Sequence, residues 1–120
     1  MGRRRLIVEL GSGADLHGED VTKAAQRAVK DAVSRSCLCG LSDIFGITDP
    51  NKMYIVAKIA CPYPEKLKRD EVIKMIPFGE VKLDVVSGGL TVEGLNLPAL
   101  GEGGNIVVAI AALTVYIDVA

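Results

Sequence analysis

Two polar residues suited to catalysis, Asp15 and His17, lie within the glycine-rich segment Gly11–Gly18. His17 is the only histidine of the chain, and in an extended segment residues two positions apart point the same way. A carboxylate beside an imidazole predicts a general acid–base pair, an imidazole oriented by a carboxylate, or two ligands of a metal ion. The alternative is structural: the glycines form a turn, and the two polar side chains fix it through hydrogen bonds to nearby backbone.

A second candidate segment, Ser87-Gly88-Gly89, follows a predicted strand. Ser87 is a candidate nucleophile, although a hydroxyl at a strand end often has no chemical role. Leu16 stands where a dinucleotide-binding GxGxxG segment would have its third glycine, and no Gly-Lys-Ser/Thr sequence occurs in the chain. Both common patterns of nucleotide phosphate binding are therefore disfavoured.

The three cysteines, Cys37, Cys39 and Cys61, are an odd number and include a Cys-x-Cys pair. This spacing is not usual for zinc, so we expect no metal site with His17 and interpret the cysteines as small buried thiols. The basic N-terminal residues Arg3–Arg5 are followed by too few apolar residues for a signal peptide. Reduced thiols in a cytoplasmic protein are the expectation.

The elements around the first glycine segment can be predicted from their periodicity. Arg5–Leu10 alternates as a strand, with Leu6, Val8 and Leu10 expected on the face that packs against a helix. A glycine-rich turn is expected over Gly11–Gly18, and Asp20 stands where a helix N-cap belongs. The helix itself is indicated by an apolar stripe with spacing i, i+3, i+4 and i+7, which comprises Val21, Ala24, Ala25, Ala28, Val29, Ala32 and Val33.

Three further strands are expected, over Met53–Ala60, Glu80–Val86 and Asn105–Val119, the last as one long strand or a pair. A second helix is predicted between Pro64 and Pro77. The order β-α-β-α-β-β predicts an α/β fold in which the first three strands are parallel and the last is antiparallel. The result is a mixed sheet with two helices on one face.

The other face of this sheet is expected to carry Ile7, Val56 and Val86, which two helices cannot cover. We therefore expect a homo-oligomer in which this face is buried against another subunit. The element order resembles the chorismate-mutase-like fold of small bacterial trimers, in which sheets pack around a three-fold axis. This resemblance implies a trimer and says little about chemistry.

Composition limits the class of protein. A chain of 120 residues and 12.7 kDa is expected to form a single domain over residues 1–120. Fourteen Lys and Arg against fifteen Asp and Glu give a net charge of −1, and aromatic residues are 4%, so nucleic acid is not an expected partner. The longest apolar run, Ile106–Ile117, is too short to cross a membrane, so no membrane partner is expected.

The pattern Gly11-x-Gly13-x-Asp15-x-His17-Gly18 resembles the GxGxDxHG signature of a conserved-hypothetical family found in bacteria and plants. The segments 88–92 and 94–95 are also similar to that family, so the resemblance covers essentially the whole chain. It implies that the glycine segment is selected as a unit. The family's function is unassigned, so the resemblance implies no reaction and leaves any cofactor unknown.

A fainter resemblance is to one repeat of the ring-opening amidohydrolases, the cyanuric acid hydrolases and barbiturases. Their repeats carry a GxG turn, an Asp-x-Thr-Arg helix start and a later Ser-Gly-Gly, which here correspond to 11–13, 20–23 and 87–89. A homotrimer of this chain would imitate their three-repeat monomer. The lysine that activates the family's serine precedes the glycine turn, and Val8–Leu10 contains none, which places ring amide hydrolysis in doubt.

The leading hypothesis is a trimer-based homo-oligomer, either an enzyme or a binding protein, with a site for a small polar or anionic ligand at subunit boundaries. Asp15 would orient or ionise His17, and the helix start near Asp20 would receive an anionic or carbonyl oxygen. The rival hypothesis is a non-catalytic assembly or regulatory module in which the glycine segment only braces a subunit contact. The residues expected at the shared site are Gly11, Ser12, Gly13, Asp15, His17 and Gly18 on one side and Ser87, Gly88 and Gly89 on the other.

Overall fold

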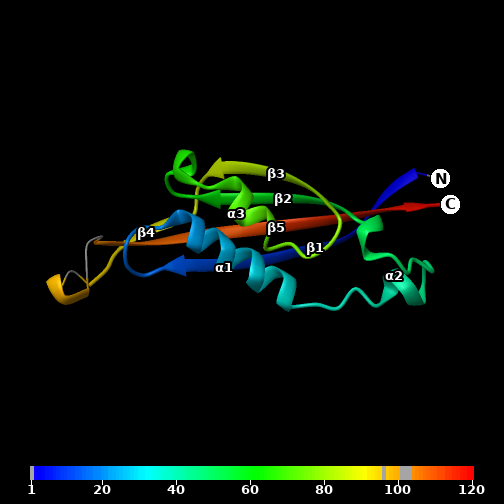
Figure 1. Ribbon diagram of the computed structural model, residues 1–120, viewed down its shortest axis with the longest axis horizontal. Helices are drawn as coiled ribbons and strands as arrows, with labels where there is room; N and C mark the ends of the chain where they lie inside the picture. The colour runs from blue at the N-terminus through cyan, green and yellow to red at the C-terminus, as the bar shows by residue number, and fades with distance from the viewer. Residues whose placement is uncertain (1, 96, 101–103) are drawn as a thin grey trace.

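The protein is elongated and consists of one long sheet with helices on one face (Figure 1). The computed structural model describes residues 2–95, 97–100 and 104–120, with dimensions of 58 × 23 × 19 Å. The two termini lie at one end and β4 at the other (Figure 1). The strands and helices are β1 (Gly2–Asp15), α1 (Val21–Ser34), α2 (Gly40–Asp43), β2 (Tyr54–Cys61), α3 (Arg69–Ile73), β3 (Glu80–Ser87), β4 (Leu90–Glu93) and β5 (Asn105–Val119), with short 3-10 turns at Pro50–Lys52, Pro64–Lys66 and Pro98–Leu100.

The strand β5 lies at the centre of the sheet. It pairs antiparallel with β1 on one side and with β2 on the other, and β2 pairs parallel with β3, which gives the order β1-β5-β2-β3. The strands β1, β2 and β3 therefore run in the same direction, and the predicted mixed α/β sheet is confirmed. The fifth strand, β4, was not predicted: Thr91 and Val92 favour a strand and pair with β5, although glycines surround them.

The first predicted helix is confirmed and the second is shorter than predicted. Helix α1 begins after Asp20, whose Oδ1 accepts a hydrogen bond from the backbone N–H of Lys23 at 3.1 Å. The segment after Pro64 forms only a 3-10 turn and then α3. The 3-10 turn and α3 do not join into one helix, because the N–H of Lys68 donates to Thr22 Oγ1 at 3.0 Å and not to a carbonyl of its own segment.

Helices α1 and α3 pack on the same face of the sheet, which we call the covered face (Figure 1). Alternate residues of the strands point into this layer, and the small side chains of α1 allow the helix to approach closely. The core of the covered face includes Val21, Ala24, Ala25, Ala28, Val29 and Ala32 from α1, Ile55, Ala57 and Ile59 from β2, Val72 from α3, and Val107, Ala109, Ala111, Leu113, Val115 and Ile117 from β5.

The predicted turn over Gly11–Gly18 is wrong in its first half, because Gly11–Asp15 continues β1 as a strand. Gly11 and Gly13 lie directly beneath the backbone of α1. A Cβ atom at Gly11 would lie 2.3 Å from the carbonyl oxygen of Ala28, and one at Gly13 would lie 2.4 Å from the amide nitrogen of the same residue. These two glycines are therefore needed for contact between strand and helix, not for chain reversal.

The predicted facing of β1 is also wrong. The pairing register shifts between Arg5 and Ile7, which is the signature of a bulge, so Ile7 lies opposite Val115 on the covered face. Val8 and Leu10 consequently lie on the other face, where 45% and 59% of their surface is exposed. We call this second face the open face.

No helix in the described part of the chain is long and apolar enough to cross a membrane.

Candidate functional site

The junction between β1 and α1 is organised around the buried side chain of Asp15, which is 6% exposed. Its Oδ2 accepts a hydrogen bond from the backbone N–H of Asp20 at 2.8 Å, and its Oδ1 lies 3.6 Å from a guanidinium nitrogen of Arg27. The same nitrogen of Arg27 donates to the carbonyl oxygen of Ala14 at 2.6 Å. Asp15 therefore ties the end of the strand to the start of the helix.

His17 lies in the loop 16–20, which joins β1 to α1. Gly18 has a φ of +96° and Glu19 one of +52°, so the chain turns sharply before α1. The side chain of His17 is exposed, and no hydrogen bond or ion pair among the described residues joins it to Asp15. The described residues therefore lack the hydrogen bond that was expected between this carboxylate and this imidazole.

Next to this loop, a hollow of about 440 Å³ lies at the N-terminus of α1. Three lysines line it, Lys23, Lys66 and Lys68, and so do three carboxylates, Glu19, Asp20 and Glu71. The formal charges of these side chains balance, so the preference for an anion comes from the positive end of the helix dipole. The sequence analysis did not identify Lys66 and Lys68 as candidate site residues. Both follow β2 closely, and β2 ends at the same end of the sheet as β1, so this position was the available signal.

The second predicted segment lies at the same end of the sheet, on the far side of two strands. Gly88 N–H donates to the carbonyl oxygen of Cys61 at 3.1 Å, and the side chain of Ser87 is exposed. Because β5 and β2 separate β3 from β1, Ser87 lies roughly 14 Å from the strand that carries Asp15. One chain therefore does not bring the two predicted halves of the site together.

Gly89 has a structural requirement of its own. Its φ is +71°, and a Cβ atom there would lie 2.0 Å from the carbonyl oxygen of Val108 on β5. Only glycine allows the chain to leave β3 and pair as β4 at this distance. The glycine that was expected to contact a ligand is thus used in strand pairing.

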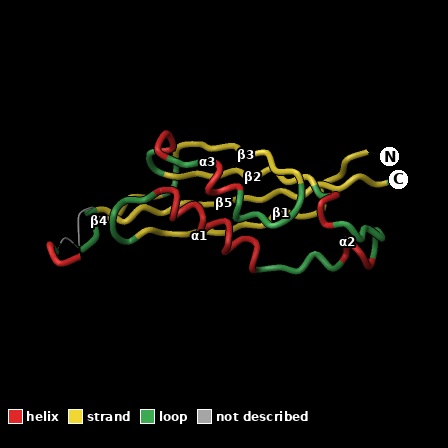
Figure 2. The backbone as a smooth tube through the Cα atoms, in the orientation of Figure 1, coloured by secondary structure: helices red, strands yellow, loops and turns green. Residues whose placement is uncertain are grey.

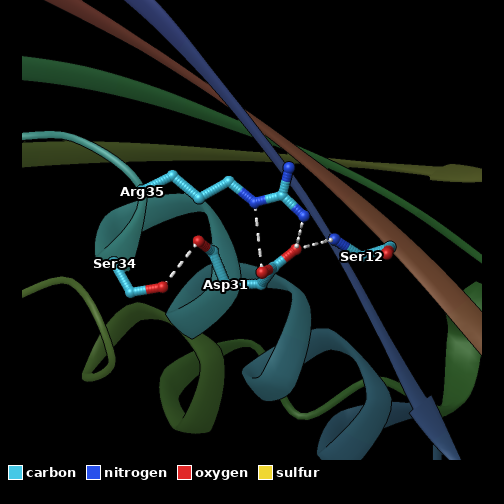
Figure 3. A network of polar contacts seen from close by, with 4 residues as sticks. All are labelled: Ser12, Asp31, Ser34 and Arg35. Carbon is cyan, nitrogen blue, oxygen red and sulfur yellow. Dashed lines mark hydrogen bonds and ion pairs between the residues drawn. The ribbon is translucent and has the colours of Figure 1, made fainter.

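A polar network fixes the outer edge of β1 to α1 (Figure 3). The carboxylate of Asp31 accepts a hydrogen bond from the backbone N–H of Ser12 at 2.9 Å. It accepts two more from Arg35, one from Nε at 3.2 Å and one from a terminal guanidinium nitrogen at 2.9 Å. The hydrogen bond from Ser12, followed by that from Arg35, lowers the pKa of Asp31 below its ordinary value. An outward-facing backbone group of this edge strand is thereby satisfied by a helix side chain, and the backbone of Ser12 is not free for a ligand.

The interpretation of the cysteines as buried thiols is confirmed only for Cys61. Cys37 and Cys39 are exposed in the connection between α1 and α2. Burial, with a smaller contribution from the carboxylate of Glu65, raises the pKa of Cys61. In the described part of the chain, no three His, Cys, Asp or Glu side chains are grouped as metal ligands would be.

These features define a small α/β protein with a mixed five-stranded sheet and a rigid strand–helix junction. The chain belongs to the family described as "Conserved hypothetical protein (Lin0512_fam)", which matches residues 5–115. It is also similar to a solved structure described as an FtsZ-like protein of unknown function from Nostoc punctiforme, with 43% identity, 98% of each chain covered and a TM-score of 0.88. No curated protein matches.

The resemblance to a conserved-hypothetical family is therefore confirmed, and neither comparison assigns a reaction. The fainter resemblance to the ring-opening amidohydrolases stays a prediction.

Proposed function

We propose that the protein is a non-catalytic assembly module, in which the open face binds a second copy and the glycine segment braces the subunit. The observation that carries this proposal is the exposure of large aliphatic side chains on the open face. Five of them are 45–60% exposed, namely Val8, Leu10, Leu90, Val92 and Ile110. Soluble monomers rarely leave large contiguous apolar patches in water, and such a patch usually marks an interaction site.

The pairing register makes these residues neighbours. Leu10 lies opposite Ala112 and Ile110 opposite Ser12 between β1 and β5, while Leu90 lies opposite Val108 between β4 and β5. Because paired residues project to the same side of a sheet, the patch is continuous across three strands. Val56 and Val86, which were expected on this face, extend it toward β3.

A second copy of the chain fits this patch better than a charged partner. Lys58 lies opposite Asp84 between the positions of Val56 and Val86, so the β2–β3 side of this face carries both signs of charge. A surface that carries both signs of charge beside an apolar centre can pair with the same surface of a second copy across a two-fold axis. Across a three-fold axis it can pair with a neighbouring edge of the next copy. The trimer expected from the sequence is one form of this assembly.

Sedimentation of the purified protein at micromolar concentration tests the proposal. We expect an oligomer, and we expect Ile110→Lys or Leu10→Lys to convert it to a folded monomer with an unchanged circular dichroism spectrum. The matched control is Ile44→Lys, because Ile44 is 76% exposed but lies directly after α2, away from the open face. A monomeric parent protein, or an oligomer that survives both open-face substitutions, contradicts the proposal.

The second candidate function is binding of a small anionic ligand at the junction, supported by the hollow at the N-terminus of α1, where three lysines are balanced by three carboxylates and the helix dipole adds a positive field. His17 lies in the adjoining loop and would contact such a ligand without the help of Asp15. Titration with inorganic phosphate, followed by NMR of the backbone amides, should shift residues 18–23. Lys68→Ala should weaken phosphate binding several-fold. The control is Lys82→Ala, which removes an exposed lysine of β3 and should leave phosphate binding unchanged. Absence of shifts at millimolar phosphate would remove this candidate.

A further inference from the structure

A cavity of about 330 Å³ lies on the covered face, beyond the C-terminal end of α1. Helix α1 ends at Ser34, and the connection that follows runs away from the sheet toward α2 (Figure 2). This leaves a part of the covered face without a helix over it. Most of the residues that line the cavity are apolar, and they include Val33, Leu38, Leu41, Met53, Ile55 and Leu113.

One carboxylate breaks the apolar lining. Glu9 lies opposite Leu113 in the pairing of β1 with β5, so its side chain points to the covered face. It is half-buried, and it accepts a hydrogen bond from the hydroxyl of Ser36, which also lines the cavity. Within residues 2–95, 97–100 and 104–120, no lysine or arginine forms an ion pair with Glu9 or lines this cavity.

A ligand that filled this cavity would take the half-buried carboxylate of Glu9 further out of water, which costs free energy unless the carboxylate is paired. A ligand cation that donates hydrogen bonds to Glu9 would offset this cost, and a charge-assisted bond of this kind is stronger than a neutral one. The apolar lining in turn favours an aliphatic or aromatic body. The two demands together describe a small amphipathic amine.

We propose that this cavity is a binding site for a small amphipathic amine, whose ammonium group pairs with Glu9 and whose apolar body contacts Met53, Ile55 and Leu113. The volume is at the lower end of the roughly 300–1,000 Å³ that small-molecule sites occupy, and it is concave, which suits a small molecule and not a flat protein surface. The cavity is on the opposite side of the sheet from the open face. The proposal is therefore independent of assembly.

NMR titration of the isotope-labelled full chain with three matched probes tests the proposal: 2-phenylethylammonium, 2-phenylethanol and phenylacetate. We expect the ammonium compound to shift the amides of Met53, Ile55 and Leu113 and to bind about tenfold more tightly than the alcohol. Phenylacetate should bind more weakly than the alcohol, because its charge repels Glu9. This comparison uses the unaltered protein, so it does not depend on any variant folding.

Glu9→Gln, which keeps the size of the side chain, should reduce the affinity for the ammonium compound about tenfold and leave the alcohol unaffected. The matched control is Glu93→Gln, because Glu93 is exposed on β4, far from the cavity. Equal affinities for the three probes, shifts confined to other residues, or no binding of the ammonium compound would each overturn the proposal.

Discussion

The covered face and the open face carry alternate residues of the same strands, yet they use side-chain size in opposite ways. Beneath α1, β1 contributes Gly11 and Gly13, so that strand and helix backbones lie in direct contact. On the open face, the intervening positions carry Val8 and Leu10, large side chains that remain about half exposed. The difference teaches that the part of the covered face beneath α1 is closed within one chain, whereas the open face has the side chains of a core without the layer that would bury them.

The largest effect is expected where the covered face is tightest. Gly11→Ala would place a methyl group 2.3 Å from the carbonyl oxygen of Ala28, so α1 must move as a unit. Overpacking of this kind should cost at least about 3 kcal/mol of unfolding free energy, measured by urea denaturation. Gly40→Ala is the control, because its new methyl group would meet only the flexible end of Ile44, at 3.3 Å. Equal stability of Gly11→Ala and the parent would show that the helix is not in close contact.

A smaller loss is expected where Asp15 joins the covered face to the loop. Asp15→Ala removes the acceptor of the Asp20 N–H and leaves Arg27 without its carboxylate, which should cost about 2 kcal/mol of unfolding free energy. Asp15→Asn keeps an acceptor and should cost less. Thermal unfolding measures both, and Asp43→Ala, at an exposed position of α2, serves as the neutral control. A change below about 0.5 kcal/mol in Asp15→Ala would contradict the role of this residue as a brace.

Helix α1 and the strands β2 and β3 were predictable because their periodicity is determined by the covered face, whereas β4 was not predicted and the second helix is shorter than predicted. The Ala- and Val-rich stripe of α1 and the alternation of β2 and β3 are direct consequences of that burial. The facing of β1 was not predictable, because the side that packs against α1 carries Gly11 and Gly13, whereas the larger apolar side chains, Val8 and Leu10, lie on the open face.

The position of the glycine segment in the fold was predictable, but the use of its glycines was not. The segment that contains Asp15 and His17 does lie at the carboxyl end of β1 and the start of α1, as a ligand site in an α/β protein would. A glycine can make room either for a ligand or for the backbone of a helix. The residue type is the same in both cases, so the sequence alone could not distinguish them. Glu9 was missed for a different reason: its cavity is formed by segments far apart in the sequence, and no local pattern marks it.

The edge of the covered face gives a pH-dependent prediction. The pKa of Asp31 is lowered in the folded state by the Ser12 N–H and by Arg35, so its contribution to stability is present above the unfolded value of about 3.8 and is lost as the pH falls through the lower folded value. Asp31→Asn should therefore be less stable than the parent at pH 7, by less than Asp15→Ala, and this difference should shrink below pH 3.8. Urea midpoints measured from pH 7 to 2.5 test this. A difference that stays constant across this range would show that the carboxylate has no role in fixing the edge.

The smallest effect is expected at His17, which shares a sequence pattern with Asp15 but none of its described contacts. His17→Ala should change the unfolding free energy by no more than about 0.5 kcal/mol, because the side chain is exposed in loop 16–20. Thermal unfolding of His17→Ala beside Asp15→Ala measures the contrast between two residues only two positions apart. If loss of the imidazole destabilised the protein as much as loss of the carboxylate, both would belong to the brace. A neutral result leaves the imidazole available to contact a ligand, while the carboxylate maintains the junction.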